Sequence, residues 1–146
     1  MTPVVFAGQN VAYNTFMDAN MNITQLSERI AEVLQVISPP ARLAILLAIG
    51  RGEACVCHLE SILGWRQAYI SQHLMALRKA EILHDRRQGR YVYYRLKDES
   101  ILNLVRDAAA LSGLDPQSVD ALANPNPGAD CECPHCAPEP IRIGPN

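Results

Sequence analysis

Two groups of cysteines are the residues of this 146-residue chain best suited to chemistry. Cys55 and Cys57 stand two residues apart, and Cys131, Cys133 and Cys136 lie together much later in the sequence. Thiolates are soft ligands that favour thiophilic ions, but two thiols alone make a weak site. We therefore expect one or two of the late thiols to close over the early pair, within one subunit or across a dimer, and to complete a metal site.

The number of sulfur ligands would set the choice of ion. Three sulfurs suit trivalent arsenic or antimony, As(III) or Sb(III), and four suit Cd(II), Pb(II) or Zn(II). On a regular helix the side chains of Cys55 and Cys57 would project about 200° apart. Both can then bind one ion only if the first helical turn is frayed or distorted, so binding is expected to deform the start of that helix.

Other interpretations of the cysteines stay open on the sequence alone. A cysteine in a short helix is often a small buried apolar residue. Cys131, Cys133, His135 and Cys136 could form a zinc knuckle by themselves, and thiols of low pKa could respond to oxidation or persulfidation. The run from Cys133 to Cys136 also resembles a thiol oxidoreductase motif, but it lacks the strand and long helix that such a motif requires. We therefore do not expect an enzyme.

The bulk composition predicts one domain in a reducing compartment. The chain is 49% apolar, and its longest apolar run, from Leu43 to Ile49, is far shorter than the roughly 20 residues that span a bilayer. Residues 1–22 contain no lysine or arginine and so lack the basic start of a secretory signal. We therefore expect a cytoplasmic protein with no membrane association, whose cysteines are ligands or redox thiols rather than structural disulfides.

A basic block interrupts an otherwise acidic chain. Residues 66–97 hold eight basic and two acidic side chains, whereas the remaining residues hold five basic and thirteen acidic ones. Affinity for DNA comes largely from lysine and arginine side chains that displace counterions from the phosphates. The basic block therefore indicates a nucleic-acid surface, with a solvated charged face as the alternative.

The spacing of apolar residues predicts a mainly α-helical domain with a small β-hairpin. Residues 91–96 alternate with a period of two, and the Gln88-Gly89 step supplies a turn, so a hairpin is expected there. Helical spacing predicts helices over 24–36, 41–49, from Val56 to a stop at Gly64, around Ile70, Leu74 and Leu77, and over 98–112.

Two short helices joined by a tight turn, the second with small and amide side chains outward, are typical of a helix-turn-helix. The outer face of the second helix enters the major groove, where an amide such as Gln72 can pair with adenine. Arginines on the hairpin would contact the DNA backbone or minor groove and position the protein. The candidate DNA-binding residues are Gln67, Tyr69, Ser71, Gln72, Arg78, Arg86, Arg87 and Arg90.

Two motifs carry a family resemblance. Glu53-x-Cys55-Val56-Cys57-x-Leu59 and Ser71-x-His73-Leu74-x-x-Leu77-Arg78, with the hairpin after them, resemble the ArsR/SmtB family of metal-sensing repressors over about 24–112. The resemblance implies a homodimeric winged helix-turn-helix protein whose interface is built from 24–37 and 98–112. It also implies a repressor that binds double-stranded operator DNA, expected to be an inverted repeat, when metal-free and leaves it when metal binds.

Two departures from the family pattern bear on the ligands. The family's arsenic and cadmium sensors usually carry an acidic residue where this chain has His58, so an extra donor appears here. Other members bind zinc through histidine and carboxylate ligands on the terminal helix, and 98–112 contains no histidine. We therefore expect the cysteines, rather than the terminal helix, to hold the ion.

The sequence predicts three parts and one main function. Residues 1–22 would form an N-terminal arm, 23–113 the winged helix-turn-helix domain for DNA binding and dimerisation, and 114–146 a proline-rich, cysteine-containing tail, flexible from about 124 and with room for a short helix over 116–123. The predicted protein is a repressor released from its operator by As(III), Sb(III), Cd(II), Pb(II) or Zn(II) on cysteine thiolates. The alternative is a thiol-redox-sensing repressor of the same fold.

Overall fold

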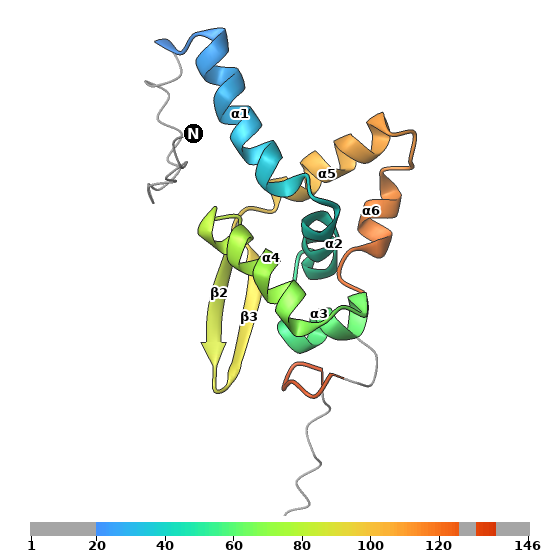
Figure 1. Ribbon diagram of the computed structural model, residues 1–146. Coiled ribbons are helices and arrows are strands. Elements are labelled where there is room, and N and C mark those ends of the chain that lie inside the picture. Colours follow the sequence, from blue (N-terminus) through green and yellow to red (C-terminus); the bar gives the residue numbers. More distant parts are fainter. Residues whose placement is uncertain (1–19, 126–130, 137–146) are drawn as a thin grey trace, which may run out of the picture.

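The computed structural model describes residues 20–125 and 131–136, so nearly all of the predicted N-terminal arm lies outside the described residues. The described elements confirm a mainly helical domain with one small sheet (Figure 1). No single described helix is long and apolar enough to cross a membrane, and α1 and α2 reach that threshold together only across a 78° bend. In order, the elements are α1 (Ile23–Ile37), α2 (Pro40–Ile49), β1 (Glu53–Cys55), α3 (Val56–Leu63), α4 (Gln67–Lys79), β2 (Leu83–Gln88), β3 (Tyr91–Leu96), α5 (Ser100–Leu111) and α6 (Gln117–Leu122).

The hydrophobic core is centred on α2. This helix is almost wholly apolar and buries Ile45 and Leu46 completely. The stripe of α4 predicted from Ile70, Leu74 and Leu77 is buried in the same cluster, as is Leu59 of α3. Full burial of such side chains stabilises the fold by roughly 1.5–3 kcal/mol each. The helix-turn-helix is therefore held firmly on α2.

The sheet contains one strand more than the sequence predicts. β2 and β3 form the expected antiparallel hairpin, with Leu83 opposite Leu96 and Gln88 opposite Tyr91. β1 pairs antiparallel with the other edge of β3, which gives the strand order β1-β3-β2. A strand of three residues is too short to show a period of two, so only its pairing with β3 defines it.

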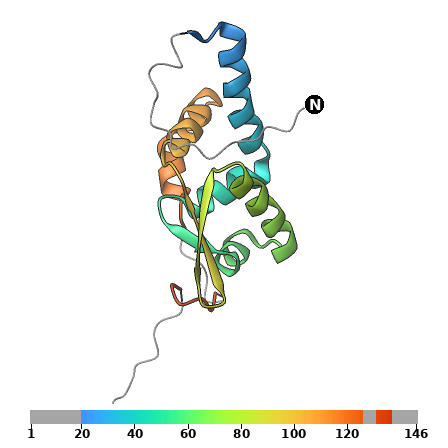
Figure 2. The ribbon, with the colours of Figure 1, turned by 90° about the vertical axis from the view of Figure 1, so that its left-hand side faces the viewer.

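The described residues that follow α5 lead back along α2 to the end of the molecule where α3 lies (Figure 1). The short helix allowed over 116–123 is present as α6, which packs against α5 and α2. Beyond it the Asn124 N–H donates a hydrogen bond to the Leu47 carbonyl oxygen (2.8 Å). Residues 131–136 then form a compact turn at the α3 end of the molecule, beside the hairpin, in both views (Figures 1 and 2). The sequence predicts a flexible chain here, whereas the structure has an ordered turn. The turn is held because it buries Cys131 and Cys133.

Gly50 allows the segment after α6 to approach α2. Its φ is 55°, and a Cβ there would lie 2.8 Å from the Asn124 Cβ. We expect Gly50→Ala to lower the free energy of unfolding by about 1–3 kcal/mol, because alanine is strained at this φ and would push against Asn124. Chemical denaturation measures the loss.

Gly113→Ala is the matched control for this substitution. Gly113 also has a positive φ, 79°, but a Cβ there would meet no atom of the described residues within 4 Å. Its replacement should therefore cost the strain alone. Equal losses for the two variants would mean that the approach to Asn124 contributes nothing.

Candidate metal centre and DNA interface

The junction of β1 and α3 brings Cys55 and Cys57 together. Cys55 caps α3 with extended dihedrals (φ −85°, ψ 171°), and its sulfur accepts a hydrogen bond from the His58 N–H (3.4 Å). Cys57 lies in the first turn, with its Sγ 2.7 Å from the Cys55 Sγ. The prediction that the two thiols meet only on a distorted helix is therefore wrong. A residue at the N-cap does not follow the helical rotation of about 100° per residue, so the regular cap already pairs them.

The late cysteines are buried against this pair. Cys131 and Cys133 are 4% and 0% exposed, and they form a small cluster with Cys55 and Tyr93. The Cys136 N–H donates to the Cys133 carbonyl oxygen (2.9 Å) and closes the turn. The Cys131 Sγ lies 3.2 Å from the Cys57 Sγ. The structure thus gathers all five predicted ligands into one place.

Four of these thiols have the spacing of a metal site. The sulfur atoms of Cys55, Cys57, Cys131 and Cys133 all lie within 4.8 Å of one another. Zinc–sulfur bonds of about 2.3 Å in a tetrahedron place the sulfurs roughly 3.8 Å apart. The four-thiol set therefore fits a tetrahedral thiophilic ion with small side-chain movements, and any three of its members offer a trigonal sulfur set.

The thiols differ in how readily they ionise. Burial raises the pKa of Cys57 to about 11, and it also raises the pKa of Cys55 and of Cys136. Burial also opposes ionisation of Cys133, but hydrogen bonds from Cys136, Cys55 and Cys131 outweigh it and lower the pKa of Cys133 to about 7. Of these four thiols, Cys133 is therefore the one that ionises most readily near neutral pH. Binding through Cys55, Cys57 or Cys136 must displace a proton.

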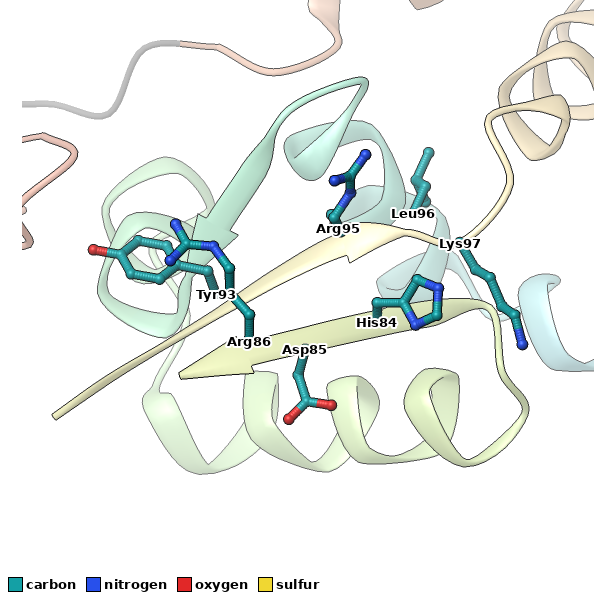
Figure 3. A pocket seen from close by; sticks show the side chains of 7 residues that line it. All are labelled: His84, Asp85, Arg86, Tyr93, Arg95, Leu96 and Lys97. Carbon is teal, nitrogen blue, oxygen red and sulfur yellow. The ribbon is translucent and has the colours of Figure 1, made fainter. Parts of the chain in front are cut away.

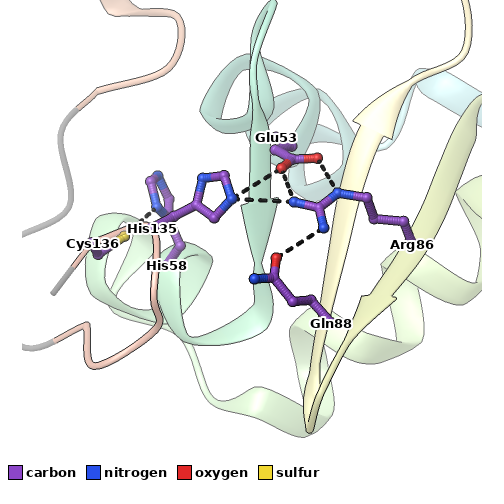
Figure 4. A network of polar contacts seen from close by, with 6 residues as sticks. All are labelled: Glu53, His58, Arg86, Gln88, His135 and Cys136. Carbon is purple, nitrogen blue, oxygen red and sulfur yellow. Dashed lines mark hydrogen bonds and ion pairs between the residues drawn. The ribbon is translucent and has the colours of Figure 1, made fainter. Parts of the chain in front are cut away.

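His58 adds a nitrogen donor to the cluster. It sits in the first turn of α3, is 8% exposed, and its Nδ1 lies 3.1 Å from the Cys136 Sγ (Figure 4). Its Nδ1 or Nε2 and the sulfurs of Cys131 and Cys136 lie within 4.8 Å of one another. The extra donor expected from the sequence is thus in contact with the late cysteines.

Glu53 connects the late turn to the hairpin. Its carboxylate accepts hydrogen bonds from Arg86, one of them 3.1 Å from Nε, and lies 3.3 Å from the His135 Nε2 (Figure 4). The hydrogen bonds from Arg86 lower the pKa of the Glu53 carboxyl. The His135 ring packs on Tyr93, with 4.7 Å between ring centroids. Among the described residues no donor group includes His135, so the arrangement does not favour a zinc knuckle made by the tail alone.

α4 exposes most of the predicted reading surface. Gln67, Tyr69 and Gln72 are exposed on it, and Ser71 is half-buried. The Tyr69 ring meets His73 edge to face, with 4.6 Å between centroids, which holds the tyrosine on the helix surface. These side chains are free of the core and face outward as a helix in the major groove requires.

The hairpin arginines have three different environments. Arg86 lies beside a hollow of about 420 Å³ that runs along the two strands (Figure 3). Its neighbour Asp85 points the other way, towards α4, and pairs with Arg78 (2.7 Å). Arg87 is exposed and makes no ion pair with any other described residue. Arg90 donates to the hydroxyl of the adjacent tyrosine and lies over its ring. Arg86 contacts the thiol side of the sheet through Glu53, and Arg90 reaches the late turn only through the hydroxyl of this tyrosine, which donates to the Glu132 carbonyl oxygen (3.4 Å).

The comparisons with known proteins agree with this architecture. The model for the arsR family of bacterial regulatory proteins matches residues 39–85. The chain is 35% identical to a SmtB homologue of Synechocystis, covering 57% of this chain and 63% of the relative. It is also 35% identical to the HTH-type transcriptional repressor SmtB of Mycobacterium tuberculosis, covering 62% and 67%. With the arsenic resistance regulator ArsR1 of Pseudomonas putida, identity reaches 52%, over 40% of this chain and 45% of the relative.

A solved structure of a transcriptional repressor is also similar to this chain. The transcriptional repressor BigR from Xylella fastidiosa superposes with a TM-score of 0.54 and 31% identity, covering 62% of this chain and 96% of that one. The matched proteins are transcriptional regulators, which confirms the prediction of a regulator rather than an enzyme. The winged helix-turn-helix predicted from the sequence is confirmed as well. The chain belongs to the ArsR/SmtB family of winged-helix transcriptional repressors.

Proposed function

We propose that this chain is a homodimeric repressor that leaves operator DNA when its cysteine cluster binds a thiophilic metal ion. The observation that carries the proposal is the contact between Cys57 and Cys131, two thiols 74 residues apart, inside a cluster of five cysteines and one histidine. Buried cysteines that serve only packing have no need to collect their sulfurs from two distant segments. A shared ligand gives such an arrangement a physical reason.

The donor set supports two groups of ions. Four sulfurs fit Cd(II), Pb(II) or Zn(II), and three of them fit As(III) or Sb(III). The similarity to an arsenic resistance regulator supports the trivalent group. The number of sulfurs supports the divalent group, so the effector is decided by titration with each ion.

An apolar groove of about 470 Å³ supports the homodimer. It runs between α1, α2, α5 and α6, and Leu34 and Leu104 are among its lining residues. A second copy of the chain that packs against α1 and α5 would remove apolar surface from water. In the cytoplasm, a two-fold dimer would present its two α4 helices to the two halves of an inverted-repeat operator. Leu34 and Leu104 are themselves exposed, and the other large exposed apolar side chains described on these helices and just beyond α5 are Ile23, Leu26, Ile30, Leu111, Leu114 and Leu122.

The network around Glu53 provides a route from the thiols to DNA. When the late turn is docked, His135 and Glu53 hold the Arg86 guanidinium over the Tyr93 ring, 4.7 Å from its centroid. We propose that Arg86 contacts a DNA phosphate while the turn is undocked. Ligand binding by Cys131 and Cys133 favours docking, which keeps Arg86 in the network and removes one phosphate contact.

Redox sensing by the same thiols is the second candidate. The 2.7 Å separation of the Cys55 and Cys57 sulfurs favours it, because contacting thiols are positioned to oxidise to a disulfide. The lowered pKa of Cys133 favours it as well, since the thiolate is the reactive form. A metal sensor would release DNA without an oxidant, and a redox sensor would not.

Operator release is measured by fluorescence anisotropy of labelled operator DNA. Arsenite, cadmium, lead and zinc are each titrated in a reducing buffer free of chelators. We expect one of these ions to release the DNA near one or two equivalents per subunit, because the docked turn completes a set of four thiols that can share one ion. If no ion affects DNA binding but an oxidant abolishes it, the protein is a redox sensor and the metal proposal is wrong.

Glu53→Gln serves as the variant that separates binding from release in this titration. It keeps every thiol but removes the charge that holds Arg86 and His135. Metal affinity should stay close to that of the unchanged protein, while the loss of DNA affinity on metal binding becomes smaller. Full release by this variant would exclude the route through Arg86.

The contribution of the tail follows from replacing Cys131, Cys133 and Cys136 together with serine. Metal affinity should fall by more than about 100-fold, because the two remaining thiols make a weak site. Competition with a chromophoric chelator measures the change. Glu132→Gln, an exposed position in the same turn, is the control and should bind as before. Unchanged affinity in the serine variant would show that the late turn supplies no ligand.

The two parts of the DNA surface should respond differently to substitution. Gln72→Ala is expected to weaken operator binding by about 1–3 kcal/mol at one base position, because a bidentate amide contact is lost. Arg87→Ala should weaken binding to all sequences alike and reduce the salt dependence, because phosphate contacts carry no base information. Anisotropy with operator and scrambled DNA compares them, and equal losses on both DNAs for both variants would contradict the assignment.

A further inference from the structure

We infer that His58, Cys131 and Cys136 form a second metal site, which shares the Cys131 thiolate with the four-thiol site. Each subunit would then hold two divalent ions. The inference rests on the proposed function in one respect, which is that the thiols bind metal at all. It goes further in assigning His58 as a ligand, in setting the number of ions, and in giving the two sites different access to solvent.

The donors outside the four-thiol set lead to this site. One tetrahedral ion uses Cys55, Cys57, Cys131 and Cys133, which leaves Cys136 and His58 without a role. These two are in contact, with 3.1 Å between Cys136 Sγ and His58 Nδ1. The three donors of the second set are mutually within 4.8 Å, and two of them are buried. An imidazole and two sulfurs at this spacing are a recurrent donor set for zinc.

Cys131 belongs to both sets because its thiolate can bridge. A thiolate sulfur has several lone pairs and can bind two ions at once. A neutral imidazole nitrogen has one lone pair and can bind only one. The charge favours this arrangement. Four thiolates with one divalent ion carry a net charge of −2, whereas five thiolates with two divalent ions carry −1. In a buried cluster the smaller net charge costs less desolvation.

The second site is open to solvent. It has three protein donors, and a hollow of about 510 Å³ adjoins it, lined by His58 and Cys136 together with Glu53, Asn124 and His135. A tetrahedral ion held by three protein ligands keeps its fourth position for water. The four-thiol set, by contrast, can fill all four positions of a tetrahedral ion with protein ligands. The second ion is therefore expected to bind more weakly and to exchange faster than the first.

Cadmium titration of the full chain in reducing, chelator-free buffer tests the inference. Native mass spectrometry counts the ions per subunit, and ¹¹³Cd NMR distinguishes a four-sulfur site from one with mixed sulfur and nitrogen ligands. We expect two ions and two resonances. His58→Ala and Cys136→Ser should each bind one ion fewer and lose the mixed-ligand resonance, while the tight first step is kept. Glu132→Gln, in the same turn, should still bind two.

The outcomes separate this inference from the proposed function. One tightly bound ion and a single four-sulfur resonance in the unchanged protein would overturn the second site and leave the metal sensor intact. Two ions in the His58→Ala variant would remove His58 from the ligands and overturn the site as well. No binding of cadmium at all would overturn the second site together with the divalent form of the proposed function. The two-resonance spectrum of the unchanged protein supports the site even where a variant fails to fold.

Discussion

The pairing of β1 with β3 is the interaction on which the rest of the site depends. It aligns Cys55 with Tyr93 and makes Cys55 the last residue of a strand. The chain enters α3 immediately afterwards, so Cys55 becomes the N-cap and its sulfur turns back towards Cys57 and the His58 N–H. The same pairing brings Glu53 within reach of Arg86, which lies on β2 at the other side of β3. Three residues of strand thus position the early pair of candidate donors and their link to the hairpin.

β3 is the central strand, and its two neighbours lead to the two candidate sites. β1 leads into the thiol cluster, and β2 carries the hairpin arginines that the sequence assigns to DNA. Tyr93 lies between them: it is buried against Cys55, Cys131 and Cys133, and the Arg86 guanidinium stacks on its ring. The thiol cluster and the arginines expected to bind phosphate therefore lie on the two sides of one strand. The coupling that we propose between them would require the docking of a short turn and no large movement of the helical core.

The thiol cluster shows how burial and charge oppose each other. Burial favours the neutral forms of Cys55, Cys57 and Cys136 and so stabilises the docked turn as an apolar contact. The metal binding that we propose would convert the same contact into an ionic one and release protons. The proposed site would then be held together weakly without its ion and strongly with it. That difference is what a switch needs, because only differential binding shifts a conformational equilibrium.

The sequence by itself determined the elements whose signals are local. The period of the apolar residues specified α4 and its buried stripe, Ile70, Leu74 and Leu77, and the turn residues specified the hairpin, because side-chain burial repeats with the geometry of each element. The five cysteines were also recognised as one set from their types. Only the tertiary structure decided that Cys55 is an N-cap, that His58 meets Cys136, and that Glu53 holds Arg86. Those contacts join segments 33 to 78 residues apart or depend on a strand of three residues, and neither leaves a periodic trace in the sequence.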